Sequence, residues 1–114
     1  MIRKKQECAQ EIREQMKGGP GRVLQTSFVN KDELLNKGRL FGNLHLEPDC
    51  GIGYHVHENE TEIFYIASGE AVYNDNGEEK KVEAGDICIC KPGEGHGVKT
   101  IDKACDLIAV IVLA

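Results

Sequence analysis

The residues of this chain best suited to chemistry are three histidines and one glutamate in two short polar segments. His55 and His57 are two residues apart, so on a β-strand both side chains leave the same face. Glu62 follows after a short polar turn and can return on the neighbouring strand, and His96 lies in a second turn-rich segment, residues 91–96. Three imidazoles and one carboxylate are a ligand set for a first-row divalent metal. The pattern therefore predicts a metal site.

The sequence leaves three uses of these four side chains open. They form a hydrogen-bonded polar cluster without a metal, or they bind a metal that only stiffens the protein or serves ligand sensing, or they bind a metal used in catalysis. A buried carboxylate among apolar groups is costly unless a cation or metal pairs with it. We therefore expect a bound metal.

The segments that must position these residues are short strands. From Gly38 to Glu47, three leucines occupy one face, while Phe41, Asn43 and His45 occupy the other. Further strands are expected at 63–66, 70–73, 80–83 and 87–90, with turn signals between them that include the Asn-Gly hairpin pair at 76–77. The unbroken apolar run 107–114 is typical of a strand covered on both faces. Short strands separated by turns predict an all-β sandwich or barrel.

Residues 1–17 follow a different pattern, in which apolar residues recur near 3.6-residue spacing and predict a helix. These residues are Ile2, Ala9, Ile12 and Met16. Gly-Gly-Pro-Gly at 18–21 ends the pattern. Such a helix is too short and polar to be stable alone, so we expect it to dock on the domain or on a partner subunit. The predicted organisation is an N-terminal helical arm over residues 1–22 and a β-barrel domain over residues 23–114.

Composition narrows the functional classes. A chain of 114 residues fits one domain, and its net charge of −5 argues against nucleic acid or an anionic membrane as the main partner. It contains no apolar run of about 18 residues that would cross a membrane, and no signal-peptide pattern at its start. We therefore expect a cytoplasmic protein whose five cysteines are reduced. Cys88 and Cys90 are interpreted as small buried apolar residues, and a thiolate ligand or a redox pair is the alternative.

The first polar segment resembles a motif of the cupins, which are β-barrel proteins of the jelly-roll type. That motif runs Gly, five residues, HxH, three or four residues, Glu, six residues, Gly. Here it begins at Asp49 in place of glycine and continues through the HxH pair and Glu62 to Gly69. Aspartate tolerates positive φ better than most residues, so we expect the turn at Asp49 to be kept.

The second polar segment resembles the second cupin motif, which runs Gly, five residues, Pro, one residue, Gly, two residues, His, three residues, Asn. Gly85, Gly93 and His96 match it, while Lys91 replaces the proline and Thr100 replaces the asparagine. Neither replaced position is a metal ligand in the family. The resemblance covers about residues 40–114. It implies an all-β cupin double-stranded β-helix (jelly-roll) barrel, here with a short N-terminal helix.

The resemblance also implies which residues bind the metal. His55, His57, Glu62 and His96 occupy the family's ligand positions, which suggests one divalent transition metal per chain. The ligand set does not choose among Mn, Fe, Co, Ni, Cu and Zn. Four protein ligands on an octahedral ion leave two positions for water or for a substrate that binds through oxygen.

Two classes of function are consistent with such a site. The first is a metal-dependent enzyme, an isomerase, decarboxylase or dioxygenase, acting on a small carboxylate, keto acid or sugar-like molecule. The second is a non-catalytic module that binds or senses such a small ligand. His45 and Glu94 are the candidates for an additional acid–base group near the metal.

Apolar residues beyond the core predict a homodimer. If Glu62 faces the metal, Ile63 and Tyr65 face away from it. Together with the apolar run 107–114, they would form a patch of a size that soluble monomers rarely expose. Two-fold pairing of sheets would bury it.

Overall fold

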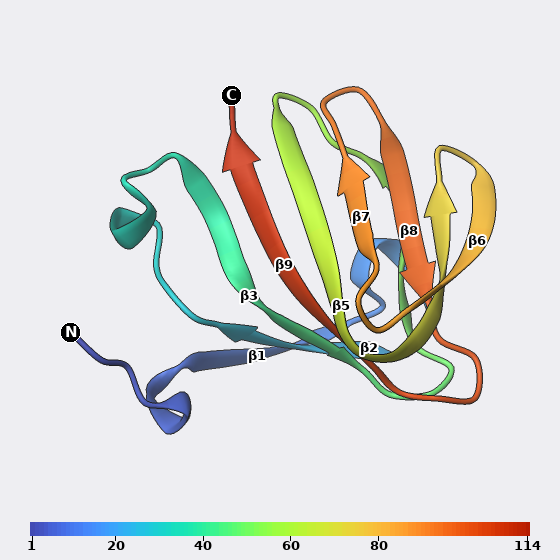
Figure 1. Ribbon diagram of the computed structural model, residues 1–114, viewed down its shortest axis with the longest axis horizontal. Coiled ribbons are helices and arrows are strands. Elements are labelled where there is room, and N and C mark those ends of the chain that lie inside the picture. The colour runs from blue at the N-terminus through green and yellow to red at the C-terminus, as the bar shows by residue number, and fades with distance from the viewer.

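The computed structural model describes all 114 residues and consists mainly of β-strands (Figure 1). The strands are β1 (Ala9–Glu14), β2 (Arg22–Ser27), β3 (Gly38–Leu46), β4 (Gly51–Val56), β5 (Glu60–Asp75), β6 (Glu78–Glu83), β7 (Ile87–Cys90), β8 (Gly95–Lys99) and β9 (Cys105–Leu113). Three 3-10 turns complete the structure: η1 (Lys5–Glu7), η2 (Met16–Gly18) and η3 (Asp32–Leu34). The expected all-β architecture is confirmed.

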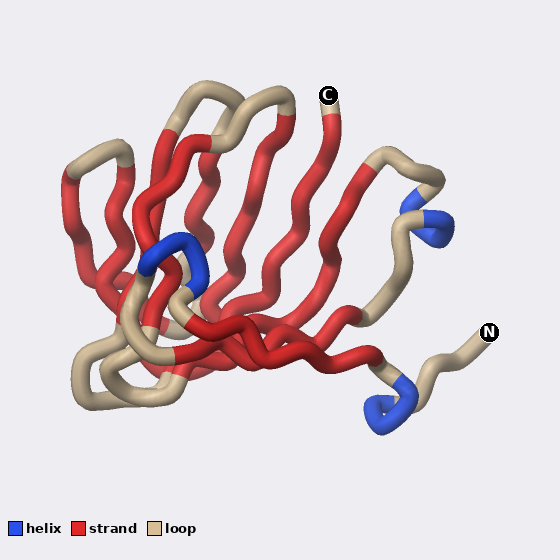
Figure 2. The backbone as a smooth tube through the Cα atoms, turned by 180° about the vertical axis from the view of Figure 1, so that it is seen from behind, coloured by secondary structure: helices blue, strands red, loops and turns tan.

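The strands form a strongly curled sheet in which the long strand β5 belongs to two layers. In the first layer the order is β1-β2-β3-β9-β5, and β7 pairs with the other edge of the first half of β5. The second half of β5 pairs with β6 and β8, and β8 pairs with β4. All of these pairs are antiparallel. Figure 2 shows the same curl from behind.

β5 changes layer at Gly69, which has a φ of +78°. A side chain there would overlap the carbonyl group of Ala104, so both the space and the backbone conformation require glycine. A register shift between Ile66 and Ser68 in the pairing with β9 lies directly before this corner. Such irregularities bend a strand and increase its twist. One continuous strand therefore links the two layers, where the sequence pattern indicated two separate segments.

The core lies between the layers. Leu44 of β3, Leu107 of β9, and Phe64 and Ile66 of β5 are almost completely buried. They face Ile52 and other buried residues of the second layer within one hydrophobic cluster. The alternation of buried and partly exposed residues along β3 and β9 follows from the two-residue period of a strand.

Four of the five cysteines belong to this buried interior. Cys50, Cys88, Cys90 and Cys105 are buried free thiols, and burial raises the pKa of Cys88, Cys90 and Cys105 to about 11. These three thiols remain protonated at neutral pH, and all four cysteines pack as small apolar side chains.

The helix predicted over residues 1–17 is wrong. Residues 9–14 form β1, which pairs with β2 from Ala9 opposite Ser27 to Glu14 opposite Arg22. Only the short turns η1 and η2 are helical there, as Figure 2 shows in blue. An isolated helix of this length is marginal, whereas the free edge of β2 offers a complete row of backbone hydrogen-bonding groups. Tertiary pairing thus outweighs the helical spacing of the apolar residues.

The domain boundary expected between residues 22 and 23 remains a prediction. β1 lies before this boundary and pairs with β2, most of which lies after it. None of the helical turns has the length or apolar character needed to span a membrane.

Candidate metal centre

The four predicted metal ligands meet at one end of the curled sheet. His55 lies on β4, directly opposite His96 of β8. His57 follows the end of β4, and backbone hydrogen bonds with Gly93 and Glu94 hold it next to the turn before β8. Glu62 lies on the first half of β5. One ligand atom from each of these side chains lies within 4.8 Å of the others.

Each histidine ring has a hydrogen-bond partner at Nδ1. These partners are the Gly53 carbonyl oxygen at 2.7 Å from His55, Glu60 Oε2 at 3.0 Å from His57, and Tyr73 Oη at 2.8 Å from His96. A carbonyl and a carboxylate oxygen can only accept, so Nδ1 carries the hydrogen in His55 and His57. The unprotonated Nε2 atom is then free to bind a metal.

The Nε2 atoms converge on one point together with a carboxylate oxygen. His57 Nε2 lies 3.1 Å from both His55 Nε2 and His96 Nε2. Glu62 Oε1 lies 3.0 Å from His57 Nε2 and 3.1 Å from His96 Nε2. Lone pairs that face one another at these distances require a proton or a cation between them. This donor set of nitrogen and carboxylate oxygen fits a first-row divalent ion.

Burial and charge also favour a cation at this point. His57, Glu62 and His96 are each at most 5% exposed, and His55 is half-buried. Burial alone would raise the pKa of Glu62, but hydrogen bonds with His57 and His96 outweigh it and bring the pKa down to about 2. Glu62 is therefore ionised. The hydrogen bond with Glu62 raises the pKa of His57, which favours the protonated imidazole beside this carboxylate in the metal-free protein.

A second set of side chains orients the ligands. The Phe64 ring stacks on His96 with centroids 5.1 Å apart and an interplanar angle of 18°. Tyr73 is 5% exposed and binds the far side of the same imidazole. Glu60 links His57 to Arg39 on β3.

The sequence pattern alone did not identify Glu60 or Tyr73 as part of the site. Glu60 lies in a run of polar and charged residues, and its place two residues before Glu62 puts both side chains on one strand face. Tyr73 reaches the site only because β5 bends into the second layer, and no local signal predicts that bend.

The two acid–base candidates do not lie among the four ligands. His45 lies between Leu44 and Leu46, which are buried in the core, so its ring points to the opposite face of β3. There it contacts Asp106 Oδ1 at 2.9 Å and Glu47 Oε1 at 3.0 Å.

The Glu94 backbone lies beside the candidate metal centre, because it hydrogen-bonds the His57 backbone. The Glu94 carboxylate makes its hydrogen bonds outside this centre. The carboxylate accepts hydrogen bonds from the Lys91 backbone at 2.8 Å and from Asn76 Nδ2 at 3.3 Å. The bond from Lys91 lowers the pKa of Glu94. A catalytic role for His45 or Glu94 therefore stays a prediction that the observed contacts do not support.

The two departures from the motifs are accommodated locally. Asp49 has a φ of +59°, so it adopts the left-handed conformation that suits glycine. Thr100 is buried, and its hydroxyl accepts a hydrogen bond from the Cys50 backbone and lies 2.6 Å from the Glu47 carbonyl oxygen. It thereby ties the turn around Asp49 to the end of β8.

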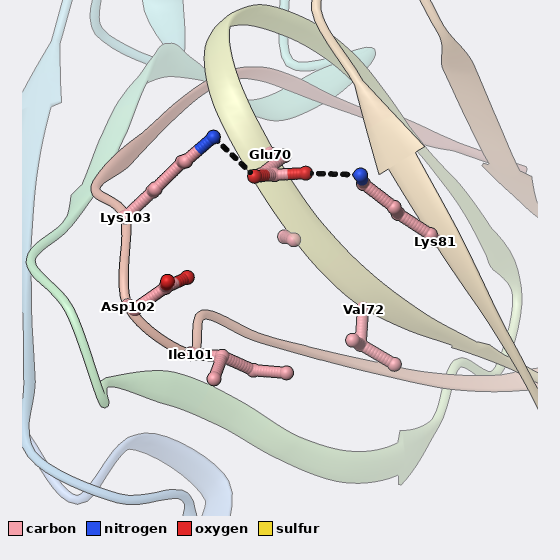
Figure 3. A pocket seen from close by; sticks show the side chains of 7 residues that line it. Glu70, Val72, Lys81, Ile101, Asp102 and Lys103 are labelled. Carbon is pink, nitrogen blue, oxygen red and sulfur yellow. Dashed lines mark ion pairs between the residues drawn. The ribbon is translucent and has the colours of Figure 1, made fainter.

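A surface pocket of about 330 Å³ lies apart from these ligands, near the corner of β5. Figure 3 shows Glu70 of β5 between Lys81 of β6 and Lys103 of the loop before β9. The two lysines lie 2.6 and 3.0 Å from the Glu70 carboxylate. Because one carboxylate engages both ammonium groups, we assign no ligand to this pocket.

Comparison with known proteins identifies the family. The family model for the cupin domain matches residues 42–112. The chain is 38% identical over 114 residues to a Thermotoga maritima protein named oxalate-binding protein, covering 99% of this chain and 94% of that protein.

Solved structures agree with this assignment. The crystal structure of a predicted oxalate decarboxylase from Thermotoga maritima superimposes with a TM-score of 0.95 at 36% identity, over the whole of both chains. An uncharacterised conserved protein from Klebsiella pneumoniae with a double-stranded β-helix domain gives a TM-score of 0.69 at 27% identity, covering 80% of this chain and 76% of that chain. The chain belongs to the cupin family.

Proposed function

We propose that this cupin binds one divalent transition metal through His55, His57, Glu62 and His96, and through that metal a small carboxylate of the oxalate class. The observation that carries the proposal is the convergence of three Nε2 atoms and one buried carboxylate oxygen within 4.8 Å. The ligand class is supported by the relative named oxalate-binding protein.

The surrounding residues suit the binding of a small anion at the metal. Glu62 lies between Cys90 of β7 and Ile111 of β9, and both neighbours are buried and apolar. Low polarity strengthens the attraction between a metal and a carboxylate ligand. When bound, the metal supplies Lewis-acid attraction for carboxylate or keto oxygens at the positions that the four side chains leave open.

Binding without turnover is the better supported of the two functional classes. Decarboxylation and isomerisation require a group that moves a proton at the substrate. His45 faces the opposite side of β3, and the Glu94 carboxylate is held by Lys91 and Asn76. A metal-dependent isomerase, decarboxylase or dioxygenase stays the second candidate, because one relative bears the name predicted oxalate decarboxylase.

The test begins with elemental analysis of protein purified without a His tag. The protein is then stripped with chelator, reloaded separately with Mn(II), Co(II) and Ni(II), and titrated with oxalate in a calorimeter. We expect one metal per chain and oxalate binding only in the loaded form. Acetate, which lacks the second carboxylate that lets oxalate form a five-membered chelate ring, should bind much more weakly.

Two ligand variants and one control show which residues bind the metal. Glu62→Gln and His96→Ala should lose the metal, whereas His45→Gln should keep it. Full metal content in both ligand variants, or equal oxalate binding by the metal-free protein, would overturn the proposal. Metal-dependent consumption of oxalate by the loaded protein would establish the enzyme instead.

We also propose that the protein is a homodimer that pairs through its outer apolar face, namely Phe41, Ile63, Tyr65, Ile87, Ile89, Ile108 and Val110. Cross-strand pairing makes this surface continuous, since Ile89 lies opposite Ile63, Ile63 opposite Val110, and Val110 opposite Phe41. Ile87 is 62% exposed and Ile89 54% exposed. The N-terminal residues form β1 at the opposite edge of the layer from β7, so no N-terminal helix covers this face.

A second copy of the chain is the occupant that fits. A single patch can bury itself against its own copy by two-fold symmetry, and two sheets that pack face to face are a common arrangement. A cytoplasmic location, and the lack of nucleic-acid and membrane partners, stay predictions from the sequence.

A further inference from the structure

One ligand, His57, is held by a chain of charged side chains that reaches to β3. His57 Nδ1 lies 3.0 Å from Glu60 Oε2. The same Glu60 carboxylate binds Arg39, with Nε at 3.1 and 3.0 Å from its two oxygens and one terminal nitrogen at 2.6 Å from Oε2. The Glu60 side chain is only 15% exposed. The position of the Glu60 carboxylate is therefore fixed by His57 on one side and by Arg39 on the other.

Local backbone structure brings Arg39 into this position. In the pairing of β3 with β9, Gly38 lies opposite Val112 and Leu40 opposite Ile111, so Arg39 is the extra residue of a bulge. A bulge re-aims a side chain relative to a regular strand. Without it, Arg39 would share the outer face with Phe41, two residues along. Glu60, by contrast, shares its strand face with the metal ligand Glu62.

We infer that Glu60 and Arg39 are positioning residues for the metal centre. Glu60 accepts the Nδ1 hydrogen of His57, which fixes both the tautomer and the orientation of the ring with Nε2 toward the other ligands. Arg39 restricts Glu60 to the rotamer that makes this bond, through a bidentate contact. The inference rests on the proposed metal binding and adds two residues that do not touch the metal.

The alternative role for these two residues is purely electrostatic, and it predicts opposite signs. A positive guanidinium near the site repels a divalent ion, so loss of Arg39 would strengthen metal binding. Positioning predicts that the same change weakens it. For Glu60, a charge effect makes glutamine as harmful as alanine, whereas positioning lets the amide oxygen of glutamine replace part of the lost hydrogen bond.

The experiment measures Co(II) affinity by competition with a chelator, together with the visible absorption spectrum of bound Co(II). The variants are Glu60→Ala, Glu60→Gln, Arg39→Ala and the double variant Arg39→Ala/Glu60→Ala. We expect Glu60→Ala to weaken affinity about 10- to 100-fold, as is typical for partners of a metal-binding histidine. Glu60→Gln should recover part of this loss. Arg39→Ala should weaken binding less, and it should add no further loss in the Glu60→Ala background.

Two control variants separate local from general effects. Arg3→Ala removes another bidentate arginine–glutamate pair, with Glu33 at 3.0 Å, and should leave affinity and spectrum unchanged. Glu58→Ala removes an exposed charge from the same turn as Glu60 and should also be neutral. Thermal melting of each metal-free variant shows that it is folded.

The outcomes distinguish this inference from the proposed function. Wild-type protein that fails to bind Co(II) refutes the metal site itself. Wild-type binding with unchanged affinity in Glu60→Ala, with equal losses in Glu60→Ala and Glu60→Gln, or with tighter binding in Arg39→Ala overturns only the positioning role.

Discussion

At the scale of single residues, the direction of each histidine ring depends on what its Nδ1 atom contacts. The three rings use three different partners: a backbone carbonyl, a carboxylate and a tyrosine hydroxyl. Two of these partners lie close in sequence, Gly53 two residues before His55 and Glu60 three residues after His57. The third partner, Tyr73, is 23 positions from His96 and reaches it only through the fold of β5.

Tyr73 provides a direct test of this dependence. In Tyr73→Phe, Nδ1 of His96 loses its hydrogen-bond partner in a buried position, which costs about 1–3 kcal/mol of stability in the metal-free protein. The ring is also freed to turn, so metal affinity should fall by about 10-fold or more. Chelator competition and urea unfolding measure the two effects. Tyr54→Phe, at a half-exposed tyrosine, is the control. Equal affinities in the two variants would contradict the assigned role.

The sequence predicted that the four candidate ligand side chains would meet, but it did not predict the residues that support them, for a physical reason. His55 and His57 share a face because strands repeat every two residues, and this holds whatever the rest of the chain does. Arg39 reaches Glu60 only through a bulge between β3 and β9. Its residue type carries no sign of that bulge, and the contact spans 21 positions in the chain.

At the scale of elements, free strand edges and strand bends determine features of the fold that the sequence pattern did not predict. The apolar residues of the first segment fit a helix, yet Ile12 lies on β1 and is 55% exposed. Helical spacing is a weak signal when an unpaired strand edge is available. The central strands β3 and β9 were predictable, because alternation along β3 reflects burial against the second layer, and the apolar run of β9 supplies both its buried face and its outer face.

A polar cluster joins three strands on the outer side of the first layer. Asp106 of β9 contacts His45 of β3 at 2.9 Å and accepts a hydrogen bond from Ser68 of β5 at 2.9 Å. Hydrogen bonds with Glu47 and Asp106 raise the pKa of His45. The protonated form is thus favoured in the folded protein, and it links the strands by charge as well as by hydrogen bonding.

This cluster gives the stability of the metal-free protein a pH dependence. A raised histidine pKa contributes stability that is complete below the unfolded pKa of about 6.5 and is lost as pH rises through the folded pKa. Wild type should therefore exceed His45→Gln in unfolding free energy at pH about 5.5, and the difference should shrink by pH about 8.5. Because the His45 and Asp106 side chains are partly exposed to solvent, the unfolding free-energy difference should change by less than about 1 kcal/mol between the two pH values. Urea unfolding at both pH values measures it, and a constant difference would contradict the assignment.

At the scale of the whole molecule, the two faces of the curved first layer carry different groups of residues. The concave side carries the core and the four candidate metal ligands, and the convex side carries the outer apolar face. The sequence indicated this division, because the outer positions of β5 are as apolar as the inner ones. It did not show that the N-terminal segment lies at the opposite edge of the layer, which leaves the outer face of β5 and β7 without cover within the chain.

Dimerisation through this face makes a prediction about mass. Ile89 of β7 is 54% exposed and adjoins Ile63, so in the proposed dimer both become buried. Ile89→Asp would place a carboxylate in the interface without a partner, which costs several kcal/mol and should dissociate the pair. Light scattering should give about twice the 12.6 kDa chain mass for wild type at micromolar concentration and about one chain mass for the variant.

The control for this experiment is Ile101→Asp, which introduces the same charge at a residue that is 65% exposed and lies in the loop between β8 and β9. It should keep the mass of wild type, because that loop is not part of the outer apolar face. All three proteins should bind metal equally, since Ile63 and Ile89 point away from Glu62 and its neighbours. A wild-type mass of one chain, or an unchanged mass in Ile89→Asp, would refute dimerisation through this surface while leaving the metal centre unaffected.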